Sequence, residues 1–158
     1  MENDELEAAD PACKLELEHV IGRRAYDRHN NVKIDCLDRI IYCASSLMVF
    51  LQDSIDPNAE SYIKQTFLRP DVDVKQSISP EVSCFTLSDD RRRLFIGTNG
   101  VVAALYVWEI PTNIQMEKME LPQISMIYCM KVAFDSKQLL IIGVTPEFVG
   151  SIMFLDYS

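Results

Sequence analysis

The stretch that decides the fold runs from Val82 to Glu109 and reads VSCFTL-SDDRR-RLFIG-TNGVVAA-LYVWE. Its runs at 82–87, 93–97 and 105–109 are short and rich in β-branched and aromatic residues, which is typical of β-strands. The Ser-Asp-Asp segment after the first run predicts a turn, because short acceptor side chains bond the backbone two residues further on. Asn99-Gly100 tolerates the positive φ that a tight hairpin requires. We therefore expect three consecutive strands joined by hairpins.

The same order of segments recurs later in the chain. Strand-like runs follow at 127–134, 139–143 and 153–156, with a turn at Asp135-Ser136. The distances from Cys84 to Cys129, Gly97 to Gly143 and Trp108 to Leu155 are 45, 46 and 47 residues. This period is close to that of the four-stranded blades of β-propellers.

An earlier part of the chain has the same rhythm, with strand-like runs at 32–35, 40–44, 47–51 and 62–68. The predicted fold is therefore all-β: a partial β-propeller of about three blades of short antiparallel strands, whose ring is not closed. We expect an acidic flexible tail over 1–13 and the partial propeller over 14–158, with blade one at about 14–69, blade two at about 81–120 and an incomplete blade three at about 124–158.

Three blades are fewer than the ~4–8 that close a propeller and remove its exposed edges. An open ring leaves apolar blade faces in water, and terminal repeats need capping. We expect a fragment of a longer protein, a truncated gene model, or a ring completed by other blades of the parent chain or by a partner. In isolation, the 158 residues are expected to be poorly soluble.

At two places the chain resembles the WD-repeat family. Trp108-Glu109 and Leu155-Asp156 stand where that family has its Trp-Asp dipeptide, and the resemblance covers roughly residues 32–158. The family's Gly-His dipeptide, expected between Leu68 and Val82, is absent, and Arg69-Pro70-Asp71 stands there. The resemblance therefore implies degenerate blades, held more by apolar packing than by a buried polar network.

A narrower resemblance lies near the N-terminus. Residues 15–24, 28–32 and 40–44 are similar to the opening of the echinoderm microtubule-associated-protein-like family, and ciliary WD-repeat proteins begin in a similar way. This resemblance implies a non-catalytic scaffold that binds tubulin or axonemal proteins and is located in the cytoplasm, at the cytoskeleton or the axoneme of a cilium or flagellum. The alternative is a WD-repeat adaptor in another complex, such as a ubiquitin-ligase receptor or a trafficking coat.

The composition of the chain excludes several classes of partner and location. A net charge of −9 argues against nucleic acid and against an anionic membrane surface, because both need a basic protein surface. No apolar run approaches the ~20 residues of a membrane span. The first residues are acidic, whereas a secretory signal begins with basic ones. Hence we expect a cytoplasmic protein.

The sequence contains no pattern that predicts an enzyme or a cofactor. Phosphate-binding glycine motifs and the nucleophile elbow are absent. The five cysteines include no close pair of the C-x-x-C type, so we expect no metal site. Cys43, Cys84 and Cys129 lie in predicted strands, where we expect buried free thiols.

Two groups of arginines are the candidate partner-binding residues. Arg91, Arg92 and Arg93 form one cluster, and Arg23, Arg24 and Arg28 form the other. One interpretation is a solvated hairpin tip balanced by neighbouring acids. The other is a contact with the acidic surface of tubulin, guided by local positive potential. Trp108 is interpreted as a residue that packs between blades.

Overall fold

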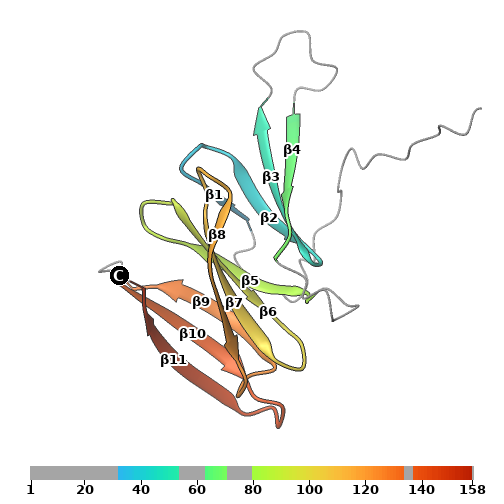
Figure 1. Ribbon diagram of the computed structural model, residues 1–158, viewed down its shortest axis with the longest axis vertical. Helices are drawn as coiled ribbons and strands as arrows, with labels where there is room; N and C mark the ends of the chain where they lie inside the picture. Colours follow the sequence, from blue (N-terminus) through green and yellow to red (C-terminus); the bar gives the residue numbers. More distant parts are fainter. Residues whose placement is uncertain (1–31, 54–62, 71–79, 134–136, 158) are drawn as a thin grey trace, which may run out of the picture.

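The computed structural model describes residues 32–53, 63–70, 80–133 and 137–157. These contain no helix and form three antiparallel sheets, which follow one another along the chain as a fan (Figure 1). We call the sheets blades one, two and three. Blade one comprises β1 (Val32–Ile34), β2 (Ile40–Ala44), β3 (Leu47–Asp53) and β4 (Ile63–Leu68); blade two comprises β5 (Val82–Leu87), β6 (Arg93–Thr98), β7 (Ala103–Glu109) and β8 (Ile114–Leu121); blade three comprises β9 (Met126–Val132), β10 (Gln138–Val144) and β11 (Gly150–Asp156).

In every blade the strand order equals the chain order, so each sheet is a meander of hairpins. None of the sheets is closed. The predicted all-β fold, a partial propeller with an open ring, is confirmed. The strand predicted over 14–22, the expected tail and the turn at 135–136 lie outside the described residues.

Blade two lies between its two neighbours. Its strand β5 contacts β2 of blade one, and β5 and β6 contact β9 of blade three. Two apolar cores follow from this arrangement. The first core joins blades one and two through Ile41, Met48, Phe50, Phe85, Leu94, Ile96 and Tyr106. The second core joins blades two and three through Phe95, Leu105, Val107, Ile127, Met130, Leu139 and Ile141.

Strand β6 shows why a blade strand is apolar throughout. Leu94 and Ile96 belong to the first core, and Phe95 between them belongs to the second. All three are fully buried. Successive side chains of a strand point to opposite faces, so a sheet covered on both faces needs a continuous apolar run. Burying each side chain of this size contributes about 1.5–3 kcal/mol.

Equivalent residues in the first two strands of blades two and three are 45 positions apart. Leu94 and Leu139 both lie in the core toward the preceding blade. Cys84, predicted to be buried, is half-buried and packs against the second core, whereas Cys129 is exposed. The prediction that Cys129 is a buried thiol is wrong, because the described residues supply no sheet beyond blade three to cover it. Cys43 is buried as expected.

Gly97 and Gly143, which are 46 residues apart, do not occupy equivalent positions in their blades. A Cβ atom on Gly97 would lie 2.9 Å from Ile127 in the following blade. A Cβ atom on Gly143 would lie 2.6 Å from Ile124, in the connection that leads into blade three from blade two. Because side chains alternate along a strand, a shift of one residue moves a position to the opposite face. The two glycines therefore serve different contacts.

Blade three leaves its outer face uncovered. In β7 of blade two, Leu105 and Val107 are buried against blade three. The residues 47 positions later on β11, Ile152 and Phe154, are 66% and 70% exposed. This apolar face is the exposed blade surface that an open ring predicts.

Candidate protein-interaction surface

Alternate connections of a meander lie at the same edge of its sheet. We call the edge that carries the predicted arginine cluster the turn edge, defined by residues 35–39, 88–92, 110–113 and Tyr157. Backbone hydrogen bonds join these turns: Cys36 N donates to Arg91 O (3.3 Å), and Ile110 N donates to Arg92 O (2.8 Å). The β5–β6 turn is therefore held from blade one and from its own blade.

The acidic residues before the arginines organise this turn. Ser88 Oγ donates to Asp90 Oδ1 (2.5 Å), and Arg92 N donates to the same oxygen (3.0 Å). Arg93 N donates to Ser88 Oγ (2.9 Å). The hydrogen bond from Ser88, with the backbone N–H and the positive charge of Arg92, lowers the pKa of Asp90. The carboxylate is thus part of the turn's structure, as turn chemistry predicts.

The three clustered arginines have different surroundings. Arg93 Nη1 donates to Tyr157 O (2.8 Å), and its guanidinium lies 5.9 Å from the Tyr157 ring centre, so it links blade two to the end of blade three. Arg91 and Arg92 are exposed on the turn. Within the described residues, neither guanidinium forms an ion pair. Two of the three are therefore available to a partner.

Arg91 adopts an unusual backbone conformation, with φ of 58°. The turn between β1 and β2 has Asp38 at φ 57°, and the turn between β7 and β8 has Asn113 at φ 53°. Asp and Asn are enriched in this left-handed region, whereas arginine is not. Strained residues of this kind occur often at functional sites.

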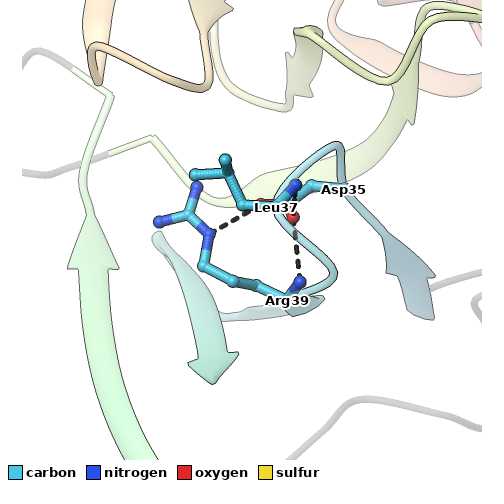
Figure 2. Close-up of polar contacts among 3 residues, drawn as sticks. All are labelled: Asp35, Leu37 and Arg39. Carbon is cyan, nitrogen blue, oxygen red and sulfur yellow. Dashed lines mark hydrogen bonds and ion pairs between the residues drawn. The ribbon is translucent and has the colours of Figure 1, made fainter. Parts of the chain in front are cut away.

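A buried ion pair lies beneath the same edge in blade one (Figure 2). Arg39 Nε donates to Asp35 Oδ2 at 2.7 Å, and Asp35 Oδ1 accepts from the backbone N–H groups of Leu37 (2.8 Å) and Arg39 (2.9 Å). The Arg39 guanidinium lies 4.6 Å from the centre of the Phe50 ring. Sequence reasoning missed this pair. Its signal was an Asp and an Arg four residues apart, at either end of a turn between apolar strands.

The remaining candidate residues can be placed briefly. Arg23, Arg24 and Arg28 lie outside the described residues. Trp108 is half-buried and packs against the first core, in keeping with its interpretation as a packing residue. Over the described ranges, no group of three or more His, Cys, Asp or Glu side chains is arranged to hold a metal ion. The same ranges include no helix with the length and hydropathy of a membrane span.

Comparison with known proteins bears on the fold. No protein-family model matches the chain, and no curated protein is significantly similar to it. A chain of the solved structure titled "Crystal Structure of Mitotic Checkpoint Complex" is similar, with a TM-score of 0.51 and 11% sequence identity. The match covers 86% of the present chain and 43% of that chain. At this identity the similarity shows the fold alone, and the three open sheets fit part of a β-propeller.

Proposed function

We propose that the chain is part of a non-catalytic WD-repeat scaffold that binds other proteins and is associated with microtubules or the ciliary axoneme. The observation that carries the proposal is the arginine turn. Arg91 and Arg92 are exposed on a turn that is fixed by hydrogen bonds to its neighbours. A rigid scaffold that presents charged side chains on a loop is a common arrangement for protein recognition.

Tubulin's acidic surface is the partner that this turn would suit best. Guanidinium groups bind carboxylates through two parallel hydrogen bonds, and such recognition needs no net positive charge on the whole protein. The resemblance of residues 15–24 and 40–44 to microtubule-associated proteins supports the same partner. A cytoplasmic and cytoskeletal location follows from this proposal.

Similarity to a chain of a multi-protein complex also supports a scaffold. The proposal includes no catalytic step; the hydroxyl–carboxylate contact of Ser88 with Asp90 serves the hydrogen bonding of the turn itself. An adaptor role in another complex, such as a ubiquitin-ligase receptor or a trafficking coat, uses the same fold and is the second candidate.

Microtubule co-sedimentation of the full-length protein tests the proposal. The informative variant is R91N/R92Q, because asparagine accepts the positive φ of position 91 and the turn should fold at least as well. We expect binding about tenfold weaker for this variant. The matched control is K64Q/K131Q, which removes two exposed charges from strands β4 and β9 and should bind normally.

Two results would separate the candidates. If the wild-type protein does not pellet with microtubules and gives no ciliary signal in cells, the microtubule association is wrong. Affinity purification that recovers a ligase or coat complex would then favour the adaptor role.

A further inference from the structure

The two ends of the fan each present an apolar sheet face. Blades one and three are its end blades (Figure 1). We call the face of blade one that points away from blade two the leading face, and the uncovered face of blade three the trailing face. The leading face is defined by Val32, Ile34 and Ile40, and the trailing face by Leu140, Ile152 and Phe154.

The leading face is built like the faces that blades two and three bury inside the chain. Ile40, Leu94 and Leu139 occupy one position, because each pairs with the last residue of its blade's first strand. Leu94 and Leu139 are fully buried against the preceding blade, whereas Ile40 is 43% exposed. The leading face therefore has the composition of a blade interface without the blade that would cover it.

The trailing face is likewise equivalent to two buried faces. Phe50, Val107 and Phe154 occupy one position in the third strands, since each pairs with the residue that directly follows the position just described. Phe50 and Val107 are 2% and 9% exposed, whereas Phe154 is 70% exposed. Two residues earlier, Leu105 is buried and Ile152 is exposed. The trailing face is thus a second blade interface that lacks its cover.

Within the chain, these two types of face pack against each other. Phe50 of blade one and Leu94 of blade two belong to the same core. Val107 of blade two and Leu139 of blade three repeat the contact in the second core. A second copy of the chain supplies the trailing face with a leading face, and the leading face with a trailing face. Both contacts are of the type that the fold already makes twice.

We propose that two copies of the chain close one six-bladed ring, with the trailing face of each copy packed on the leading face of the other. The blade number selects this assembly. One copy has three blades and three copies would have nine, whereas two copies have six, within the ~4–8 that close a propeller. The ring has two-fold symmetry, and its closure leaves no blade face uncovered. This inference concerns ring closure and does not depend on the proposed scaffold role.

Charge does not oppose the contact. The residues that define the two faces are uncharged. Lys131 pairs with Leu140 and lies beside the trailing face. The aliphatic stem of a lysine can cover apolar surface while its ammonium group stays in water. The burial of apolar side chains therefore drives this association.

Sedimentation velocity of the 158-residue chain tests the proposal. The wild type should sediment as a species of twice the chain mass of 18.1 kDa. I152E/F154E charges the trailing face, and I34K/I40K charges the leading face. Each variant alone should dimerise at least about a hundredfold more weakly, because the new charges would be buried without partners. All four positions are exposed in the single chain, so circular dichroism should show unchanged β-sheet content.

An equimolar mixture of the two variants should restore a dimer. One of its interfaces is then the wild-type contact, and the other places lysine against glutamate. The matched control is V101E/F148N, which changes two exposed apolar residues at hairpin tips, away from both faces, and should remain dimeric. Asparagine accepts the φ of 61° at position 148.

Several results would overturn the proposal. A monomeric wild type would mean that the open faces do not recognise each other, and species larger than a dimer would mean that the ring does not close. Loss of dimerisation in I152E/F154E but not in I34K/I40K would indicate a contact between two trailing faces. A mixture that stays monomeric, or loss of the dimer in V101E/F148N, would also contradict the ring. Microtubule pelleting with R91N/R92Q leaves both faces unchanged, so the proposed function and this inference can fail separately.

Discussion

The contact of Gly97 with Ile127 provides a quantitative test of how blades two and three pack. A Cβ atom at position 97 would meet Cβ and Cγ2 of Ile127 at 2.9 Å and Sγ of Cys84 at 3.1 Å. Ordinary contacts begin at 3.4 Å, so the sheets must separate by about half an ångström. Overpacking of this kind costs about 1–3 kcal/mol. We expect G97A to lower the free energy of unfolding by about 1–2 kcal/mol, after the gain from replacing a strand glycine.

The matched control is G150A. Gly150 also lies in a strand, has no atom near its would-be Cβ and is exposed. The same substitution should there raise stability by about 0.4–1 kcal/mol, through the lower entropy of the unfolded chain. Urea unfolding followed by fluorescence of the single tryptophan, Trp108, measures both. The clash should be smaller in an I127A background, since Cγ2 is then absent. If G97A is as stable as G150A, Ile127 does not sit over position 97 and the described packing is wrong.

Three further outcomes are expected. D35N leaves the charge of Arg39 buried without its partner and should lower the free energy of unfolding, measured in urea, by about 3–5 kcal/mol. The double variant D35N/R39M should lose less. Equal stability of D35N and wild type would contradict the buried pair. S83A removes the 2.5 Å inter-blade hydrogen bond to Ile127 O and should cost about 1 kcal/mol by the same assay, whereas no change would mean that this bond contributes nothing. Asp90 has a lowered folded-state pKa, so its contribution to stability is complete above the unfolded-state pKa of 3.8 and is lost as the pH falls through the folded-state pKa. The difference in unfolding free energy between wild type and D90N should therefore shrink in that acidic range. A difference that grows there would refute the assignment.

Local patterns were sufficient to predict the strands and most turns. The runs at 82–87, 93–97 and 105–109 became β5, β6 and β7, because β-branched and aromatic residues fit a pleated surface whatever covers it. The Ser-Asp-Asp turn formed through short-range hydrogen bonds that depend on neighbouring residues only. These parts of the fold follow from chemistry within a few positions of the chain.

Only the tertiary structure decided on which face of its sheet each residue lies and which blade packs against that face. Strand sequences that are apolar on both faces do not reveal their register, so Gly97 and Gly143 looked equivalent although they meet different neighbours. The burial of Arg39 against Asp35 and the exposure of Cys129 likewise depend on how separate sheets stack. The physical reason is that a strand's side chains alternate, so its own sequence sets two faces, but only the neighbouring sheet determines whether a face is buried or meets water.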